Sequence, residues 1–386
     1  MAPKLSFAAA VVAALLAGLS SAWLPEGKLR GVNLGSMFVF EPWIDSGEWS
    51  NMGCGDARSE FDCVSSLGQD AADSAFQSHW QDWVAEDDLD EMMAAGLNTI
   101  RIPLGYWIYE DIVDSSEHFP KGGFDILKTF VGKASDRGFY IILDLHGAPG
   151  AQQVNNAFTG QYNPSADFYN DYNYGRAVQW HAWMAEQVHS NDEFRNVGMI
   201  ELVNEPLQGN APESLRSEYY VDALQAIRDA ESSKGVGSGS QLHVQMMSDL
   251  WGSGNPSQYL GDSSNTAYDD HRYLKWDSSV AVSKDAYLSE SCDNDRVAED
   301  TLVIGEWSLS VPDDVEGSDD WDPSSNADFY SRWFAAQIQS YERSALGWVF
   351  WTWKAGLDDP RWSYKDALDA GIISKDLDSV INSSVC

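Results

Sequence analysis

The chain has 386 residues, of which 60 are acidic and 24 are basic, so its formal net charge is −36. The basic residues form no cluster, and a surface of this charge repels nucleic acids and anionic membranes, so we exclude both as partners. Hydrophobic residues make up 44% and charged residues 22% of the chain, which excludes a disordered or fibrous protein.

The N-terminus has the features of a secretory signal peptide. Lys4 is followed by an apolar run from Phe7 to Leu19 and then by Ser20-Ser21-Ala22, with small residues at the positions that signal peptidase reads. The run is shorter than the roughly 20 residues that a membrane-spanning helix needs. We therefore expect residues 1–22 to be a signal peptide, and residues 23–386 to form a secreted, extracellular monomer.

Apolar, β-rich runs alternate with helical patterns along the rest of the chain, without a linker or a compositional break. We predict strands at residues 29–34, 99–102, 140–145, 199–203, 242–247, 267–273, 302–304 and 348–351. We predict helices at residues 82–95, 124–137, 167–189, 213–232 and 326–343, the first two ended by Gly96 and Gly138. Unbroken apolar strands are typical of parallel strands that are buried on both faces. The pattern predicts a single α/β domain, a (β/α)8 TIM barrel.

The long stretch from Gly35 to Trp80 contains none of these predicted elements. In a barrel it follows the first strand, so we expect an elaborated loop at the C-terminal face, where active sites of this fold lie. An open, doubly wound sheet is the alternative architecture. It is disfavoured because no Gly-rich phosphate loop follows any predicted strand.

Four cysteines allow two disulfides in an oxidising compartment, with three possible pairings. The short loop between Cys54 and Cys63 favours that pair, which leaves Cys292 to pair with Cys386. Free structural thiols are the alternative. Asn382-Ser383-Ser384 is an acceptor sequon for N-glycosylation, near the C-terminus.

Two predicted strands end in a glutamate, which indicates chemistry at the barrel mouth. Glu205 closes the fourth strand and Glu306 the seventh, and these strands lie on opposing sides of a barrel. A pair of carboxylates is the apparatus that glycoside hydrolysis requires. A solvated loop charge is the alternative for either residue alone. The 17 Trp and 16 Tyr agree with a sugar-binding cleft, because aromatic rings stack on pyranose faces, although core packing must explain most of them.

Seven ordered motifs carry a family resemblance. They are Arg30-Gly-Val-Asn-Leu-Gly35, Phe40-Glu-Pro-Trp43, Thr99-Ile-Arg-Ile-Pro-Leu-Gly-Tyr-Trp107, Asp144-Leu-His-Gly-Ala-Pro-Gly150, Leu202-Val-Asn-Glu-Pro206, Gly305-Glu-Trp307 and Trp348-Val-Phe-Trp-Thr-Trp353. Together they resemble glycoside hydrolase family 5, in particular the fungal branch of exo-β-1,3-glucanases and endo-β-1,6-glucanases. The resemblance implies a retaining mechanism without a metal or other cofactor, with Glu205 as the acid/base and Glu306 as the nucleophile.

The resemblance also implies roles for residues around this pair. Arg101 would hold the Glu306 carboxylate ionised, and Tyr273, of a His271-x-Tyr273 pair, would donate a hydrogen bond to it. Asn204 would bond the sugar 2-hydroxyl. Glu201 lies four residues before Glu205, so it sits ~13 Å deeper at about 3.3 Å per residue. We interpret it as a structural acid paired inside the barrel.

Three further residues are expected to contact the reacting sugar. His146 follows the third strand and would bond sugar hydroxyls, the alternative being a structural histidine bonded to a backbone carbonyl. Trp351 would be the platform under the sugar, with Trp353 as the alternative. Glu41 resembles a residue that contacts this sugar in the β-1,3 enzymes.

Departures from the exo-β-1,3 pattern bear on the substrate. They are the segment Gln152 to Thr159, Arg272 within the sixth strand, and Leu250-Trp251 after the fifth. We infer an open cleft in which Trp251 stacks an acceptor sugar, and hence an endo-β-1,6-glucanase acting on fungal cell-wall β-glucan. An exo-β-1,3-glucanase and a transglycosylase on the same residues are alternatives. A catalytically silent β-glucan-binding barrel is the alternative from a different class.

Overall fold

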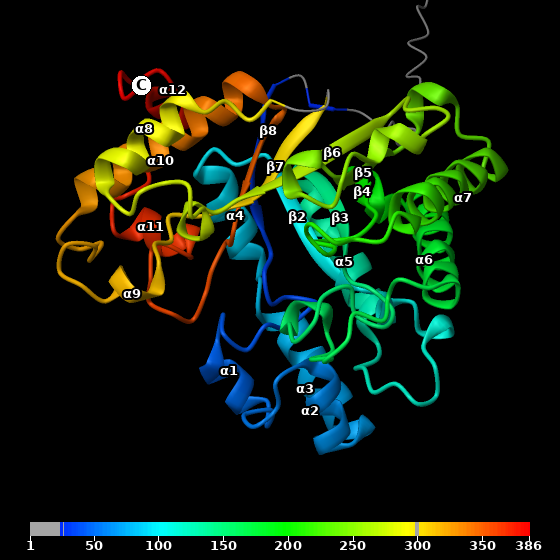
Figure 1. Ribbon diagram of the computed structural model, residues 1–386. Helices are drawn as coiled ribbons and strands as arrows, with labels where there is room; N and C mark the ends of the chain where they lie inside the picture. Colours follow the sequence, from blue (N-terminus) through cyan, green and yellow to red (C-terminus); the bar gives the residue numbers. More distant parts are fainter. Residues whose placement is uncertain (1–23, 26, 298–300) are drawn as a thin grey trace, which may run out of the picture.

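The computed structural model describes residues 24–25, 27–297 and 301–386. The expected signal peptide, residues 1–22, and Trp23 lie outside these residues. Eight parallel strands follow one another in chain order and close into a barrel, around which the helices pack (Figure 1). The strands are β1 (Leu29–Asn33), β2 (Thr99–Gly105), β3 (Tyr140–Gly147), β4 (Val197–Glu201), β5 (His243–Met247), β6 (Thr266–Arg272), β7 (Leu302–Trp307) and β8 (Gly347–Phe350). The predicted (β/α)8 barrel is confirmed.

Each predicted strand is present, with shifted ends. The largest differences are at β2 and β7, which were predicted to end at Ile102 and Ile304 but continue to Gly105 and Trp307. Pro103 lies in the added part of β2, although proline has no N–H for a ladder bond. The strand continues beside β3 nonetheless, with Pro103 opposite Asp144 and Leu104 opposite Leu145. This extension places the end of β2 beside the polar end of β3.

The five predicted helices correspond to α4 (Glu86–Ala94), α5 (Gly123–Asp136), α6 (Asp171–Ser190), α7 (Tyr220–Ser233) and α10 (Ala327–Ser344). The predicted start at Asp82 is wrong, because Asp82 ends α3 (Gln69–Asp82) and α4 begins four residues later. The Asp88 side chain accepts a hydrogen bond from the Ala85 amide and so fixes that later start. Gly96 and Gly138 follow α4 and α5 with φ of +79° and +85°, as expected of helix stops.

Several helices were not predicted from the sequence. The long stretch after β1 contains α1 (Ser46–Asn51), α2 (Glu60–Leu67) and α3, which lie together at one end of the barrel (Figure 1). The other unpredicted helices are α8 (Lys284–Asp293), α9 (Asp313–Glu316), α11 (Tyr364–Asp369) and α12 (Leu377–Ile381). Within the described ranges, no helix is both long enough and apolar enough to cross a lipid bilayer.

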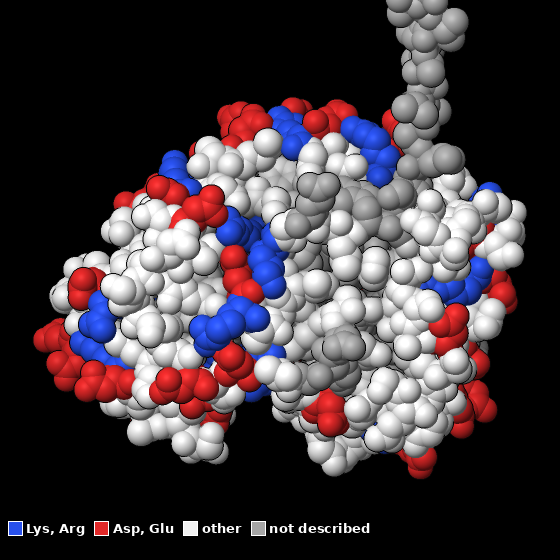
Figure 2. Space-filling model, turned by 90° about the horizontal axis from the view of Figure 1, so that it is seen from above, with Lys and Arg blue, Asp and Glu red and all other residues white. Residues whose placement is uncertain are grey.

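Both favoured disulfides are present. Cys54 pairs with Cys63 and so joins the segment after α1 to α2, while Cys292 on α8 pairs with Cys386 at the C-terminus. Asn382 follows α12 directly and its side chain is exposed. On the face shown in Figure 2, most Lys and Arg side chains lie beside acidic ones.

The barrel interior is apolar near the amino ends of the strands and polar near their carboxyl ends. Its lower part is an apolar cluster of buried residues, Leu29, Tyr140, Ile142, Met199, Ala267, Val303 and Val349. Polar side chains follow farther along the strands, and the fully buried ones include Arg101, Asp144, Glu201, Gln245 and Asp269. Charged side chains therefore lie inside the barrel toward the carboxyl ends of the strands, where the loops that follow the strands begin.

Candidate active site

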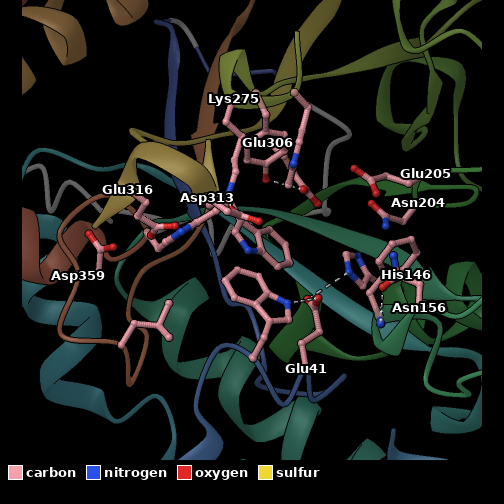
Figure 3. A pocket seen from close by; sticks show the side chains of 17 residues that line it. Glu41, His146, Asn156, Asn204, Glu205, Lys275, Glu306, Asp313, Glu316 and Asp359 are labelled. Carbon is pink, nitrogen blue, oxygen red and sulfur yellow. Dashed lines mark hydrogen bonds and ion pairs between the residues drawn. The ribbon is translucent and has the colours of Figure 1, made fainter. Parts of the chain in front are cut away.

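A cleft of about 680 Å³ opens at the carboxyl ends of the strands (Figure 3). Seven of the predicted site residues line it, namely Glu41, His146, Asn204, Glu205, Tyr273, Glu306 and Trp351. Arg101 and His271 lie beneath them and are buried. The cleft therefore brings together residues from β1, β3, β4, β6, β7 and β8 or from the segments that follow them.

Glu205 and Glu306 face each other across this cleft, with His271 between them. His271 Nδ1 lies 2.7 Å from Glu205 Oε1 and 3.4 Å from Glu306 Oε2. A carboxylate oxygen of Glu205 lies within 4.8 Å of one of Glu306. Retaining glycosidases place their carboxyl groups ~5–5.5 Å apart, whereas inverting ones need ~6.5–9.5 Å for a water molecule. The distance fits the retaining geometry.

The backbone at Glu205 is held in an unusual conformation. Its φ is +41°, a region that residues with a Cβ rarely adopt and that clusters at functional sites. Two glutamine side chains bind the adjacent carbonyls: Gln152 Nε2 donates to Asn204 O and Gln153 Nε2 to Glu205 O, each at 3.0 Å. The segment after β3 thus fixes the position of the Glu205 backbone.

Arg101 supports the second glutamate. Its Nη1 donates to Glu306 Oε1 at 3.0 Å, which is the contact expected from the sequence, and its Nε donates to Glu201 Oε2 at 2.9 Å. Its Nη2 lies 3.0 Å from Asp144 Oδ2. Glu201 is therefore paired inside the barrel, as its depth suggested. A guanidinium with this many carboxylate partners is fixed in position and carries its full charge.

The protonation states of the buried groups follow from this environment. Burial raises the pKa of Glu306, while His271 and Arg101 act against that rise. Burial disfavours the His271 imidazolium, but Glu306 and Asp269 outweigh it and raise the pKa of His271 well above its usual value. His271 is thus a cation at neutral pH. Two cations, Arg101 and His271, therefore flank Glu306.

Asn204 and Tyr273 complete the immediate surroundings of the glutamates. The Tyr273 hydroxyl donates to Glu306 Oε2 at 2.8 Å, as the sequence motif suggested. Asn204 Oδ1 accepts from Arg101 Nη2 at 2.9 Å. The buried Nδ2 of Asn204 has no hydrogen-bond partner within the described part of the chain. It is available to donate to a sugar hydroxyl in the cleft.

His146, Trp351 and Glu41 lie next to one another in the cleft lining. His146 Nδ1 lies 2.6 Å from Asp144 Oδ2, so a carboxylate and not the backbone carbonyl considered above orients the ring. The rings of His146 and Trp351 are stacked at 5.6 Å and 8°. Burial raises the pKa of Glu41 to about 7, with His146 acting against the rise. Trp353 is buried elsewhere and donates to Asp88, so Trp351 is the residue in the cleft.

Trp251 and Arg272, from which an open cleft was inferred, lie outside the cleft lining. The Trp251 indole packs edge-on against His271 at 5.5 Å, and its Nε1 donates to Pro206 O at 2.8 Å. Trp251 is thus beside the Glu205 end of the site. Arg272 points away from the cleft, toward Glu290 on α8 and the ring of Tyr341. Arg272 does not shape the cleft, because successive residues of a strand face opposite sides.

Several cleft residues had no role predicted from the sequence. They are Trp43, Asn156, Phe158, Lys275, Trp276, Asp313, Glu316, Leu357, Asp359 and Trp362. Trp43 ends one of the recognised motifs, and Lys275 and Trp276 follow Tyr273 by two and three positions. The positions of these three residues in the loops after β1 and β6 are the sequence feature that could have identified them as cleft residues.

Two groups of side chains come close enough to hold a cation in the described residues. One is Glu205, His271 and Glu306, and the other is Glu201, Asp269 and His271. His271 belongs to both, and its Nδ1 lies 2.7 Å from Glu205 Oε1 and 3.4 Å from Glu306 Oε2. The geometry is that of a hydrogen-bonded network, and the absence of a metal stays a prediction.

The chain is similar to known proteins in both sequence and fold. A family model described as cellulase (glycosyl hydrolase family 5) matches residues 64–356. The chain is 58% identical to glucan endo-1,6-beta-glucosidase B of Emericella nidulans, over 95% of this chain and 90% of that protein. It is 28% identical to the probable glucan 1,3-beta-glucosidase A of Aspergillus fumigatus, over 91% and 88%. Its fold resembles a rutinosidase from Aspergillus niger, with a TM-score of 0.71 and 19% identity, over 90% and 98% of the two chains.

Proposed function

The chain belongs to glycosyl hydrolase family 5, and on that premise we propose that it is a secreted endo-β-1,6-glucanase acting as a monomer on fungal cell-wall β-glucan. The observation that carries the reaction class is the facing pair Glu205 and Glu306, with oxygens within 4.8 Å. The similarity to a glucan endo-1,6-beta-glucosidase supports the linkage. Two disulfides support an extracellular location.

The proposed mechanism is a double displacement. Glu306 attacks C1 of the glucosyl unit above Trp351, while Glu205 gives its proton to O6 of the departing chain as the C1–O6 bond breaks. In the second step Glu205 takes a proton from water, whose oxygen attacks C1 and releases Glu306. The β configuration is retained because each step inverts C1 once.

The residues around Glu306 hold its carboxylate in position for attack on C1. Arg101 and His271 lie beside its carboxylate as cations, and Tyr273 donates to Oε2. Burial raises the pKa of this carboxyl, and the two cations act against that rise by favouring the carboxylate. Asn204 Nδ2 would donate to the 2-hydroxyl, a bond that strengthens as charge develops on the ring.

Exo-β-1,3 cleavage is the second candidate, because the chain is also 28% identical to a probable glucan 1,3-beta-glucosidase. Transglycosylation needs the same residues and differs only in whether a sugar or water accepts the glucosyl group. A silent binding barrel is disfavoured, since both glutamates and the residues that hold them are in place.

Product analysis tests the linkage and the mode of attack. We expect linear β-1,6-glucan to give a ladder of oligosaccharides early in the reaction, with little free glucose, and β-1,3-glucan to be a poor substrate. Release of glucose alone, with faster turnover of β-1,3-glucan, would establish the exo-β-1,3 alternative. Products longer than the supplied oligosaccharide would indicate transglycosylation.

The role of Glu205 is tested with Glu205→Gln. General acid catalysis contributes about 10² to 10⁴-fold, and its loss matters most when the leaving group is basic. We expect a loss of this size on β-1,6-glucan and a much smaller loss of the first step with a dinitrophenyl β-glucoside, whose leaving group needs no proton. Equal losses on both substrates would show that Glu205 is not the acid.

A further inference from the structure

The cleft continues beyond the reacting pair into an aromatic corner. Three tryptophans line it: Trp276 is 64% exposed, Trp43 is 41% exposed and Trp362 is nearly buried. Trp43 packs edge-on against Trp362 at 5.0 Å, and Trp276 lies 6.4 Å from Trp362. An exposed indole costs free energy in water unless something covers it. Trp276 therefore presents a flat apolar face to whatever occupies the cleft.

Lys275 places a positive charge between two of these rings. Its Nζ lies 5.2 Å from the centre of Trp276 and 5.1 Å from that of Trp362. It donates to Asp313 Oδ1 at 2.8 Å, and although Asp313 is 86% exposed, the Lys275 side chain is only 6% exposed. An ammonium group has three donor hydrogens, so Lys275 keeps donors for a hydroxyl next to the Trp276 ring.

Tyr273 connects this corner to the reaction centre. Its hydroxyl donates to Glu306, and its ring contacts Trp276 at 4.9 Å and Trp362 at 5.9 Å. Figure 3 shows Lys275 and Asp313 on the far side of Glu306 from Glu205 and Asn204. The leaving chain must lie beside Glu205, which protonates it. A sugar in the aromatic corner therefore belongs to the part of the chain that stays attached to the reacting unit.

We propose that Trp276, Trp362 and Lys275 form a binding site for the glucosyl unit that precedes the reacting one on its non-reducing side. Trp276 stacks on the pyranose face and Lys275 donates to one of its hydroxyls. This inference rests on the proposed function and extends it. A site that binds the preceding unit favours attack within a chain, whereas an exo-acting enzyme has no use for it.

Two aryl glycosides test the proposed binding site, because only one of them carries the glucosyl unit that would fill it. Aryl β-glucoside occupies the reacting position alone, and aryl β-gentiobioside adds the preceding unit. We expect Trp276→Ala to lower kcat/KM for the gentiobioside about tenfold more than for the glucoside. Trp276→Phe, which keeps a ring, should restore most of this difference. Tyr172→Ala is the matched control, since Tyr172 is 60% exposed on α6 and outside the cleft lining.

The outcomes separate this inference from the proposed function. Equal losses of kcat/KM on both substrates, or none on either, would overturn the site. A wild-type enzyme that prefers aryl β-laminaribioside to aryl β-gentiobioside would overturn the proposed linkage. In that case the Trp276→Ala variant still tests the site. A larger loss of kcat/KM on the laminaribioside than on the glucoside would show that the preceding unit is bound here.

Discussion

Arg101 shows how single residues link the chemistry of the site to the stability of the barrel. It contacts carboxylates from four strands, which are Asp144, Glu201, Asp269 and Glu306. Removing one partner of a buried ion pair leaves an uncompensated charge and costs about 3–5 kcal/mol. Replacing Arg101 would therefore destabilise the barrel as well as disturb Glu306, so the contacts of Glu306 are better tested one at a time.

Tyr273 offers such a test. Tyr273→Phe removes the hydroxyl that donates to Glu306 Oε2 at 2.8 Å and keeps the ring beside Trp276. The loss of one such bond to a charged group costs about 1.5–3 kcal/mol, so kcat should fall about tenfold to a hundredfold while KM changes little. Steady-state kinetics on a β-1,6-linked oligosaccharide measures this. Tyr287→Phe, on α8 and outside the cleft lining, serves as the control, and an unchanged kcat in Tyr273→Phe would refute the role.

Glu60 predicts how stability depends on pH. Burial raises its pKa to about 8 from an ordinary value of 4.5, although its Oε1 accepts a hydrogen bond from the Phe40 amide. Between these values it is protonated in the fold but ionised in the unfolded chain, so stability is full below pH 4.5 and is lost as pH rises to 8. The loss is as much as about 5 kcal/mol.

Urea unfolding of Glu60→Gln across this range checks the prediction. The amide keeps the acceptor for Phe40 and cannot ionise, so the free energy of unfolding should vary less with pH than in the wild type. Glu186→Gln, an exposed substitution on α6, should keep the wild-type slope. A Glu60→Gln slope equal to that of the wild type would contradict the assignment.

At the scale of elements, the sequence predicts the strands better than the loops. The eight apolar runs can be recognised because barrel strands are buried on both faces. The polar residues that end them predicted Glu205 and Glu306 as site residues, whereas Arg101 and Tyr273 were predicted from the family resemblance. Helices α1 and α2 have only six and eight residues, which is too short for a helical period to be recognised. Helix α3 has 14 residues and was missed despite its length. The corner of Trp43, Lys275, Trp276 and Trp362 comes from separate loops, which meet only in the folded chain.

The two disulfides join elements over very different lengths of chain. Cys54 and Cys63 are 9 residues apart in sequence, and Cys292 and Cys386 are 94 apart. The loop-entropy relation gives roughly 3 kcal/mol or slightly less for the short loop and roughly 4.5 kcal/mol for the long one. Replacing the second pair by alanines should therefore lower the free energy of unfolding more than replacing the first, as measured by urea unfolding. The reverse order would show that native-state contacts around α1 and α2 dominate.

At the scale of the molecule, the barrel assembles one cleft from segments far apart in the chain. Glu41, Glu205, Glu306 and Trp351 are brought together only because β1, β4, β7 and β8 close into one sheet. The net charge of −36 neither attracts nor repels a neutral polysaccharide, and it keeps the protein soluble. Recognition must therefore come from the aromatic and hydrogen-bonding groups of the cleft.

The central claim is that Glu306 and Glu205 cleave a β-1,6-glucosidic bond with retention. Proton NMR of a linear β-1,6-linked glucotetraose, recorded from the first minutes of the reaction, tests the linkage and the stereochemistry together. We predict that the new reducing ends appear first as the β anomer and only later equilibrate with the α anomer. Initial appearance of the α anomer, or an intact tetrasaccharide beside rapid cleavage of its β-1,3-linked counterpart, would contradict the account.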